Sequence, residues 1–571
     1  MLKAMGASPG IAIGKVMIKK EEKIEILEEL IEDVEEEIKK LDDAVEHSKV
    51  ILNELYEHTL KNIGEDEAEI FKAHELILYD PELFGKTREL IKEKKICAPY
   101  ALKTVTQEFL NIFEMMDDEY LRERASDLRD VTTRVIKKLL HMEEVDLSNL
   151  DEKVIIVAHD LTTSHTAQID KSMVKGFATE IGGTTSHSAI MARTLEIPAI
   201  VGCSNLLENV KNGDIIVFDG HEGHVYINPD KSILREFERK EIVYRELKEK
   251  LSKLKGKESV SKDGVKVELG ANIGTPDDLD GVIKNDGEGV GLFRSEFLYM
   301  DRDTLPSEEE QFNAYKKVAE GLKDKPIVIR TLDVGGDKEI PYLDLPKEIN
   351  PFLGYRAIRV CLDKKDIFKT QLRALLRASH YGNIKIMFPM ISSIEELRSS
   401  KEVVYDSMNE LKRENIPYDE EIQLGMMIEI PSAAIISDLL AKEVDFFSIG
   451  TNDLIQYTTA VDRMNNQISY LYTPYHPALL RLIKTVIDNG HKENIWVAMC
   501  GEVAGNPKLI PILLGMGLDE FSMSPISILK ARHIIRNISK KEMEIHVENI
   551  LKLSSAKDVE EYIDSNININ F

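Results

Sequence analysis

A stripe of hydrophobic residues begins shortly after Glu21 and recurs at steps of three, four or seven positions. It comprises Ile24, Leu27, Ile31, Val34, Ile38, Leu41, Val45, Leu52 and Leu55. This spacing is typical of an amphipathic helix. Similar patterns, with little β-rich sequence between them, predict further helices over Glu65–Leu78, Asp80–Lys94, Pro99–Met116 and Tyr120–His141. We therefore expect residues 21–143 to form a helical bundle.

Short β-rich runs flank the predicted bundle on both sides. The runs VIIVA, GFATE, IPAIVG and DIIVFDG lie between Lys153 and Ile227, and the segment Ala4–Ile18 has the same character. The bundle is therefore predicted to be an insertion into an α/β domain made of residues 1–20 and 144–229. The charged, periodic segment Asp230–Lys255 then predicts a helix of ~39 Å. We interpret residues 230–260 as a linker helix.

Beyond Val260 the chain alternates short apolar runs with helical stretches. The runs are VKVELGANI, GVGLF, PIVIRTLDVGG, IKIMFPM, QLGMMIEIP, FFSIGTND, IWVAMCGE and EFSMSP. Eight strands separated by helices predict a (β/α)8 barrel over residues 261–571. In that fold, catalytic residues lie at the carboxyl ends of the strands, so the chemistry should be sought there.

The charge balance is acidic and limits the kinds of partner. The 571 residues include 74 Lys and Arg against 101 Asp and Glu, a net charge of −27. This balance opposes a general affinity for nucleic acid or for an anionic membrane. Between Glu21 and Glu46 there are 13 acidic residues and 3 lysines. That run is either the solvated face of a helix or an acidic docking surface.

Cysteine usage and hydropathy indicate a cytoplasmic protein. Cys97, Cys203, Cys361 and Cys500 are scattered and form no CxxC pair, which argues against a disulfide framework or a thiolate metal site. The start MLKAMGASPGIAIGKV lacks the apolar core of a signal peptide. No later run approaches the ~18 apolar residues of a membrane helix. We therefore expect no direct membrane insertion.

Polar residues follow the predicted barrel strands in unusual number. They are Arg294, Arg330, Asp333, Glu429, Asn452, Asp453, Cys500 and Glu502, and Arg356 and Arg463 lie in loops that could join them. Arginine suits phosphate and carboxylate oxygens, while paired carboxylates suit Mg2+. An anionic, phosphorylated substrate with a bridging metal ion is therefore indicated. Any one of these residues could alternatively form a surface salt bridge.

Two further features of the barrel have more than one interpretation. Cys500 in AMCGE is either a small buried hydrophobic residue or a thiol that donates a proton to carbon. The glycine pair in LDVGGDK is not followed by the GK[ST] of a phosphate-binding P-loop. No ATP site should be inferred from that pair.

The segment IGGTTSHSAIMARTLEIPAIVG, residues 181–202, is the most informative part of the chain. Its glycines permit a close backbone approach, its hydroxyl residues donate hydrogen bonds, and an apolar helix is predicted to begin just after His187. An imidazole with an ordinary pKa of ~6.5 is largely neutral near pH 7 and can attack phosphorus without a strong base. His187 is therefore a candidate phosphoryl carrier, and an N-cap or surface role is the alternative.

These residues resemble a known family. GGTTSHSAIMARTLEIPAIVG, GVGLFRSEFL, RTLDVGGDK, NPFLGYRAIR, MIEIPSA, SIGTNDLIQY and MCGEVAG are similar, in order and essentially end to end, to Enzyme I of the bacterial phosphoenolpyruvate:sugar phosphotransferase system. The resemblance implies a swivelling phosphohistidine domain, an inserted HPr-binding bundle, a linker helix and a TIM barrel. It also implies autophosphorylation by phosphoenolpyruvate with release of pyruvate, and then phosphoryl transfer to the phosphocarrier protein HPr.

The resemblance also implies roles for individual residues. His187 would be phosphorylated at Nε2 beside Thr166, and Cys500 would protonate the enolpyruvate carbon. Glu429 and Asp453 would bind Mg2+. The residues that would hold phosphoenolpyruvate are Arg294, Arg330, Asn452, Asp453, Arg463 and, as a further candidate, Arg356.

The same resemblance implies partners. The bundle would dock HPr, and the region Asp66–Glu82, with Glu67, Glu69 and Asp80, is where we expect that contact. The basic face of HPr in that family would favour an acidic surface. The barrel domain would form a homodimer. Because one imidazole must meet both substrate and carrier, a large rotation about the segment near residues 230–260 is expected.

Two departures and two alternatives accompany this interpretation. Thr184 stands where family members usually have arginine, and His165 stands where they more often have an acidic residue. A phosphoenolpyruvate synthase or pyruvate phosphate dikinase would need a large nucleotide-binding domain before the histidine segment, but only ~180 residues precede His187. A regulatory phosphoprotein that only senses phosphoenolpyruvate would lack some of the catalytic residues. All of those residues are present in this sequence: His187, Arg294, Arg330, Glu429, Asp453 and Cys500.

Overall fold

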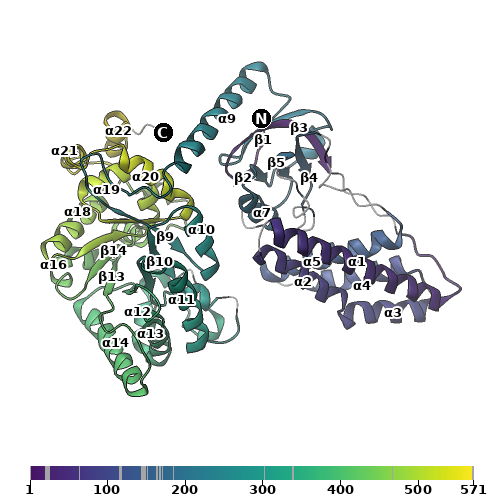
Figure 1. Cartoon of the computed structure of the whole chain (residues 1–571), viewed down its shortest axis with the longest axis horizontal. Coiled ribbons are helices and arrows are strands. Elements are labelled where there is room, and N and C mark those ends of the chain that lie inside the picture. The colour runs from purple at the N-terminus through teal and green to yellow at the C-terminus, as the bar shows by residue number, and fades with distance from the viewer. Residues whose placement is uncertain are drawn as a thin grey trace. The chain divides into compact units, whose positions relative to one another are not determined.

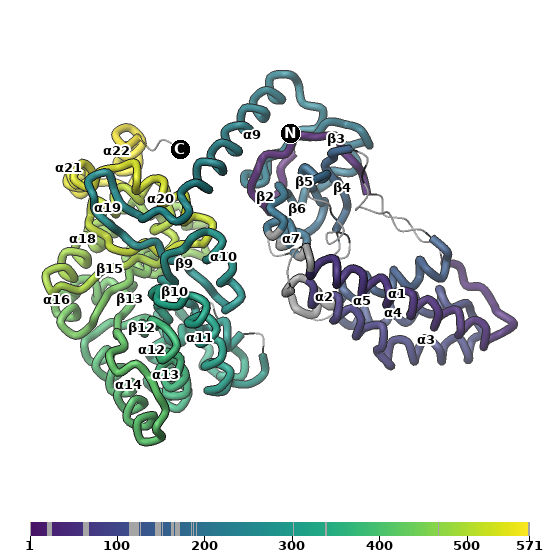
Figure 2. The backbone as a smooth tube through the Cα atoms, in the orientation of Figure 1, coloured from purple at the N-terminus to yellow at the C-terminus, as the bar shows by residue number. Residues whose placement is uncertain are grey.

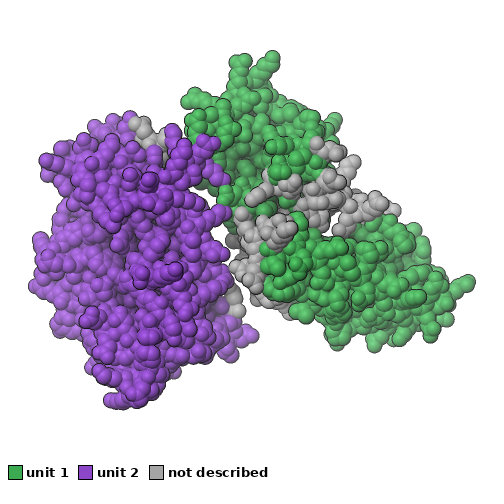
Figure 3. All heavy atoms as spheres, viewed as in Figure 1, with its two compact units in different colours: residues 1–246 green, residues 247–571 purple. Residues whose placement is uncertain are grey.

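The chain folds into two compact units, residues 1–246 and 247–571 (Figure 3). The computed structural model describes residues 2–19, 26–62, 65–114, 119–142, 150, 152–161, 165, 169, 172–183, 186–300, 302–336, 338, 340–465 and 467–568. Within these residues no helix is both long enough and apolar enough to span a bilayer. Each unit is described separately below.

The first unit contains the predicted α/β domain. Its eight strands form one sheet in the order β1-β8-β7-β3-β4-β5-β6-β2. They are β1 (Leu2–Lys3), β2 (Met5–Ser8), β3 (Ile11–Lys19), β4 (Val154–Ala158), β5 (Val174–Thr179), β6 (Ala199–Val201), β7 (Ile215–Asp219) and β8 (His224–Ile227). The helices α7 (His187–Leu195) and α8 (Leu206–Asn209) belong to this part. β3 and β4 pair in parallel, with Lys15 opposite Val154.

The helical bundle occupies the chain between these two paired strands. Its helices are α1 (Val34–Asn62), α2 (Glu65–Leu78), α3 (Pro81–Lys94), α4 (Ala98–Glu114) and α5 (Glu119–Leu139) (Figure 1). Because β3 and β4 are neighbours in the sheet, the bundle is an insertion in the topological sense that the sequence predicts. The hydrophobic stripe supplies its core, which includes Leu41, Val45, Leu52 and Leu55.

The first helix of the bundle begins later than the hydrophobic stripe predicts. Leu27 and Ile31 lie in a non-helical segment, and Ile24 lies outside the described residues. The segment pairs instead with the chain after α3, since Leu30 bridges Ile96 and the Ile31 N–H donates to the Lys95 carbonyl at 2.9 Å. The Asp33 carboxylate then accepts from the N–H groups of Glu35 and Glu36. Such capping fixes the start of a helix at Val34.

The helix α9 (Lys231–Ser252) leads from the first unit into the second, as the chain trace in Figure 2 shows. Asp230 precedes it and accepts from the backbone N–H groups of Ser232 and Ile233. The predicted linker helix is therefore present, with a carboxylate cap at its first turn.

The second unit is a closed barrel of eight parallel strands. The strands are β9 (Glu268–Ile273), β10 (Gly289–Arg294), β11 (Ile327–Arg330), β12 (Ile384–Phe388), β13 (Leu424–Ile428), β14 (Phe446–Ile449), β15 (Trp496–Met499) and β16 (Glu520–Met523). They correspond one to one with the eight predicted runs. The predicted TIM barrel is therefore confirmed.

Helices alternate with these strands and cover the barrel. They are α10 (Leu279–Lys284), α11 (Glu308–Leu322), α12 (Ile358–Asp363), α13 (Lys365–Ser379), α14 (Ile394–Glu414), α15 (Pro431–Ile435), α16 (Ser437–Leu440), α17 (Thr451–Thr459), α18 (Pro477–Lys492), α19 (Ile510–Met516), α20 (Ile528–Arg536), α21 (Lys540–Ile550) and α22 (Ala556–Asn566).

The barrel interior is filled by alternate residues of the strands. Leu292, Val328, Met387, Met427, Phe446 and Cys500 form one buried cluster, against which Trp496 packs. The Phe446 and Trp496 rings stack with centroids 4.4 Å apart. Gly425 has to be glycine here, because a Cβ at that position would lie 2.4 Å from the Phe446 ring. The interior is therefore a packed core, as in other barrels of this type.

Candidate active site

The predicted site residues of the barrel lie where its strands end. Arg294 ends β10 and Arg330 ends β11, while Glu429 directly follows β13 and Cys500 directly follows β15. Asp453 lies in the first turn of α17, after β14. Because all eight strands are parallel, their carboxyl ends share one face, and the fold brings these side chains to that face.

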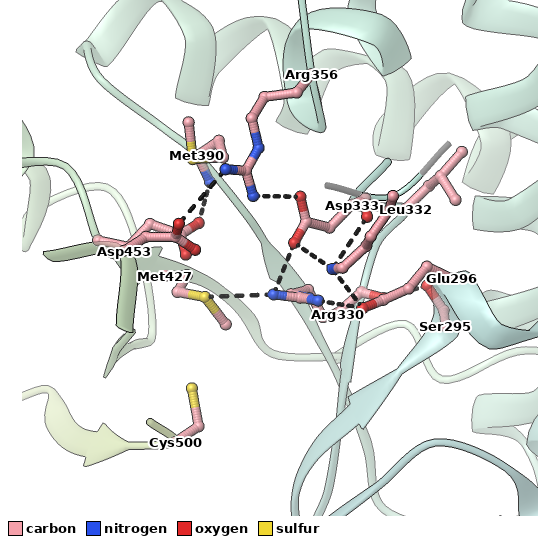
Figure 4. A network of polar contacts seen from close by, with 12 residues as sticks. Ser295, Glu296, Arg330, Leu332, Asp333, Arg356, Met390, Met427, Asp453 and Cys500 are labelled. Carbon is pink, nitrogen blue, oxygen red and sulfur yellow. Dashed lines mark hydrogen bonds and ion pairs between the residues drawn. The ribbon is translucent and has the colours of Figure 1, made fainter. Parts of the chain in front are cut away.

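Arg330 is held by two carboxylates. Its guanidinium lies 2.5 Å from Glu296 and 3.0 Å from Asp333, and both carboxyl side chains are almost completely buried. Figure 4 shows Arg330 between Glu296 and Asp333. Lys338 contacts the same two carboxylates, at 2.7 Å and 3.0 Å. Such charge-assisted contacts fix the orientation of the guanidinium before any substrate arrives.

Arg356 lies on the other side of Asp333. Its guanidinium is 3.1 Å from Asp333 and 3.4 Å from Asp453, and it donates to the Tyr457 hydroxyl at 3.2 Å. Burial favours the neutral form of Asp333, but Arg330, Lys338 and Arg356 outweigh it and hold its pKa well below the usual value. Asp333 is therefore ionised, and its carboxylate contacts the guanidinium groups of both Arg330 and Arg356.

The glycine pair in the VGGDK motif has a structural role. Gly335 and Gly336 have φ angles of +94° and +72°, a region that favours glycine. A Cβ on Gly335 would lie 2.7 Å from the Arg356 Cβ. The turn thus allows Lys338 to reach back to Glu296 and Asp333 while Arg356 packs closely beside it.

Glu429 is a buried carboxyl group next to other carboxylates. Its Oε1 accepts from the Met390 N–H at 2.6 Å. Burial, with the charges of Asp453 and Asp333, raises its pKa to about 8. A divalent cation would relieve this repulsion, and carboxylate oxygens are the ligands that Mg2+ prefers. Within the described parts of the chain no three His, Cys, Asp or Glu side chains form a metal cluster. A cation here would therefore be held by the carboxylates of Glu429 and Asp453 and by other oxygens.

Cys500 lies below this polar cluster and is 3% exposed. Figure 4 shows its sulfur directed toward the cluster. Its backbone N–H donates to the Ile449 carbonyl at 3.2 Å. Burial raises the pKa of its thiol to about 11. The sulfur therefore keeps its proton at neutral pH, as a proton donor must.

A cleft of about 630 Å3 opens beside the cluster. Among the residues that line it are Asn272, Arg294, Asn452, Tyr472, Glu502 and Ser524. The Asn452 side-chain oxygen accepts from the Glu502 N–H at 3.3 Å, and the Tyr472 hydroxyl donates to the Asn452 carbonyl. Two predicted substrate ligands, Arg294 and Asn452, thus line one cavity large enough for a small anion.

Arg463 approaches the same region from the segment after α17. Its guanidinium carbon lies 5.7 Å from the centre of the Phe352 ring, and Arg356 lies 5.7 Å from the same ring. The two predicted loop arginines therefore lie over the same aromatic ring. Because Arg356 also contacts Asp333 and Asp453, Arg463 lies near the strand-end cluster as well.

The histidine segment lies in the first unit, and α7 begins at His187. Ser186 caps this helix, because its hydroxyl oxygen accepts from the Ala189 N–H at 3.4 Å. The backbone of His187 is thus at a helix N-terminus, as the sequence predicts, where the helix dipole favours an anion. The His187 side chain, Thr184 and Thr166 lie outside the described residues.

His165, one of the two departures from the family pattern, is partly buried in the first unit. Its Nδ1 lies 2.8 Å from the Lys19 ammonium. Burial and then the charge of Lys19 lower its pKa to about 4. His165 is therefore neutral at physiological pH and does not replace the negative charge of the acidic residue that the family more often has.

The predicted docking residues differ in how they are used. Glu69 is exposed and pairs with Lys72 at 2.5 Å. Asp80 caps α3, accepting from the N–H groups of Glu82 at 2.8 Å and Leu83 at 3.4 Å. The Glu67 side chain lies outside the described residues. A role for Asp80 in docking would therefore have to coexist with its role in capping.

Sequence reasoning overlooked Glu296 and Lys338. Both follow barrel strands, in the motifs RSEFL and VGGDK, and both contact Arg330 or its partner Asp333. Glu296 could have been predicted, because it is a charged residue two positions after Arg294, which ends a strand. Lys338 was harder to predict, because the glycine turn that returns it to the cluster depends on its fold.

Comparison with known proteins identifies the family. Residues 248–540 match the PEP-binding domain of the PEP-utilising enzymes, residues 150–223 match their mobile domain and residues 3–124 their N-terminal domain. The phosphoenolpyruvate-protein phosphotransferase of Bacillus subtilis is 54% identical over 98% of this chain and 99% of its own length. That of Priestia megaterium is 53% identical over 100% and 99%. The chain belongs to the phosphoenolpyruvate-protein phosphotransferase family.

Membership of this phosphotransferase family confirms the resemblance to Enzyme I. The match to the PEP-binding domain contains every strand-end residue described above, and the match to the mobile domain contains the histidine segment. The relatives that match the chain over nearly its full length are phosphoenolpyruvate-protein phosphotransferases, so the synthase and dikinase alternatives are not supported.

Proposed function

We propose that the protein transfers a phosphoryl group from phosphoenolpyruvate to His187, releases pyruvate, and passes the phosphoryl group to HPr as the first step of sugar uptake by the phosphotransferase system. The observation that carries this proposal is the buried cluster of arginines and carboxylates at the strand ends of a barrel that matches a PEP-binding domain. A binding protein without catalysis would not need a proton-bearing thiol at the same face.

Substrate binding is assigned to the cations at the strand ends of the barrel and in the adjoining loops. Arg294, Arg330 and Arg463 hold phosphoenolpyruvate together with Asn452 and Asp453, and Arg356, which contacts Asp333, is a further candidate for the phosphate. Lys338 is a further cation, and it contacts Glu296 and Asp333, the two carboxylates that also contact Arg330. Phosphoryl transfer depends mainly on positioning and on stabilising charge on the phosphoryl oxygens, and fixed guanidinium groups do both.

Glu429 and Asp453 are the residues that would hold Mg2+. Their mutual repulsion, which contributes to the raised pKa of Glu429, supports this assignment. When bound, the ion supplies positive charge beside the substrate's anionic oxygens. Arg356, which pairs with Asp453 at 3.4 Å, would help to keep that carboxylate oriented.

The chemical step forms a bond between phosphorus and Nε2 of His187 and breaks the bond between phosphorus and the enol oxygen. The electron pair of the broken bond stays on that oxygen. Cys500 then donates its proton to the methylene carbon of the enolate, which becomes the methyl group of pyruvate. The raised pKa of the thiol, about 11, supports the presence of this proton at neutral pH.

The partners follow from the same proposal. One imidazole, on the first unit, must meet both the substrate at the strand ends of the second unit and HPr, so a rotation about the segment around α9 is part of the proposal. The acidic bundle docks HPr, the barrel forms a homodimer, and the reaction takes place in the cytoplasm. The net charge of −27 supports attraction of a basic carrier.

The test is the stoichiometry of pyruvate release. Without HPr, the protein with Mg2+ and excess phosphoenolpyruvate should release one pyruvate per chain and then stop. Adding HPr should restart release at a steady rate. Continuous release without HPr, or none in its presence, would reject the proposed phosphoryl relay. Arg330→Ala should abolish the burst, whereas Arg398→Ala, which removes an exposed pair with Glu443, should leave it unchanged.

A further inference from the structure

A buried hydroxyl lies one layer deeper in the barrel than Cys500. β14 and β15 pair in parallel, with Ser448 opposite Ala498. Phe446 and Trp496 face the interior, where their rings stack. Since side chains alternate along a strand, Ser448, Ala498 and Cys500 also face the interior. Ala498 is too small to separate the Ser448 hydroxyl from the Cys500 sulfur.

The Ser448 hydroxyl makes no hydrogen bond of ordinary geometry within the described part of the chain, although the residue is 0% exposed, and the Cys500 thiol is a group with which it interacts. Other buried serines of the second unit do not share this property. Ser400, Ser407 and Ser437 each donate to a backbone carbonyl at 2.8 Å. Buried polar groups are normally paired, so an unpaired hydroxyl next to a reactive group calls for a functional reason.

We infer that Ser448 is a positioning residue for Cys500: its hydroxyl donates a hydrogen bond to the Cys500 sulfur when that sulfur becomes a thiolate. The inference rests on the proposed role of Cys500 as the proton donor. In the resting protein the sulfur carries a proton and is a weak acceptor, so the hydroxyl makes no hydrogen bond of ordinary geometry, although it already favours the thiolate. After proton transfer the sulfur is an anion, and an aligned donor stabilises it.

The proton transfer explains why a hydrogen-bond donor is needed beside Cys500 in the barrel interior. The S–H bond of Cys500 breaks and its electron pair stays on sulfur. The enolate electrons form the new C–H bond as the C–O bond becomes a carbonyl. The product is therefore a thiolate in a barrel interior, where burial disfavours a charge.

The groups that face this thiolate come from four strands. Arg330 from β11 and Arg294 from β10 favour the anion, Glu429 after β13 opposes it, and Ser448 from β14 favours it. The two arginines are also the groups that receive the anionic substrate. Among the groups that favour the thiolate, Ser448 is therefore the one whose donor is not also needed by the phosphate.

The experiment follows exchange of the pyruvate methyl protons with D2O by NMR, on the full-length protein with Mg2+ and pyruvate. Exchange is the reverse of protonation and requires Cys500 as a thiolate. Because hydrogen bonds to charged groups contribute about 1.5–3 kcal/mol, Ser448→Ala should slow exchange about 10- to 100-fold. Its rise with pH should move to higher pH, since the thiol pKa increases when the donor is removed. Phosphorylation of His187, which precedes proton transfer, should change much less than exchange.

Three further variants complete the design. Ser448→Thr keeps a hydroxyl and should exchange within a few-fold of the wild type. Ser407→Ala removes a buried serine on α14 and should behave as the wild type. Cys500→Ala defines the rate without the thiol. Unfolding midpoints report whether each variant folds.

The outcomes separate the two proposals. If Ser448→Ala exchanges at the wild-type rate with the wild-type pH profile, the role of Ser448 is overturned. If Ser448→Thr is impaired as much as Ser448→Ala, the residue matters for packing alone, and the inference is equally overturned. If the wild type exchanges no faster than Cys500→Ala, the proton-donor role of Cys500 fails first.

Discussion

Arg356→Met tests whether the buried ionic cluster holds the barrel together as the structure indicates. Methionine keeps most of the side-chain volume and removes the charge. Arg356 is 1% exposed and contacts Asp333 at 3.1 Å and Asp453 at 3.4 Å. The substitution therefore leaves two carboxylates without this guanidinium in a buried site. Breaking a buried ion pair by removing one partner costs about 3–5 kcal/mol.

The assay is urea unfolding, monitored by tryptophan fluorescence. The chain contains a single tryptophan, Trp496. Its ring stacks on the Phe446 ring at 4.4 Å and lies 4.6 Å from the Lys385 ammonium. The signal therefore reports the barrel alone. With a urea dependence of about 3 kcal/mol per molar, the predicted loss lowers the midpoint by about 1 to 2 M.

Arg398→Met is the matched control for this prediction. Arg398 pairs with Glu443 at 2.8 Å, but its side chain is 62% exposed. Exposed pairs contribute about 0–1 kcal/mol, so the control midpoint should move by at most about 0.3 M. A free energy of unfolding for Arg356→Met within about 1 kcal/mol of the wild type would refute the reasoning that this guanidinium balances the buried carboxylates.

Three other predictions follow from the structure. Cys500→Ala should slow pyruvate formation while phosphoenolpyruvate binding is largely retained, as a steady-state assay with a binding titration can measure; unchanged turnover would remove the proton-donor role. Burial raises the pKa of Glu520 to about 8, so between about pH 4.5 and 8 the folded barrel binds a proton that the unfolded chain releases. Wild-type stability should therefore fall with rising pH by up to about 1.4 kcal/mol per unit relative to Glu520→Gln; parallel stability curves from pH 5 to 8 would contradict this. The affinity for HPr should weaken markedly with added salt, and a calorimetric affinity that stays constant across ionic strength would argue against electrostatic docking.

The barrel was predictable because its signal is local and repeated. Each apolar run was short, was followed by polar residues and alternated with a helical stretch, so β9–β16 could be assigned without knowledge of their neighbours. The start of α1 was not predictable in this way. The stripe through Leu27 and Ile31 has helical spacing, but pairing of Leu30 with Ile96, 66 positions away, prevails over that local pattern.

The sequence predicts which residues belong to the candidate site better than it predicts which of them contact one another. Arg330 and Asp333 lie three positions apart after one strand, so their proximity could be expected. That Arg356 lies against Asp333 and Asp453 depends on a glycine turn and on a loop between other elements. Ser448 gave no signal at all, because a serine inside an apolar run is ordinary until its hydroxyl is found unpaired and buried.

The central claim is that one histidine carries the phosphoryl group, and labelling tests it most directly. Incubation with Mg2+ and phosphoenolpyruvate labelled in its phosphate should leave a base-stable, acid-labile label on the wild-type chain. The label should map to His187 and be absent from His187→Ala. A wild-type chain that takes up no label, or a His187→Ala variant that retains it, would contradict the account.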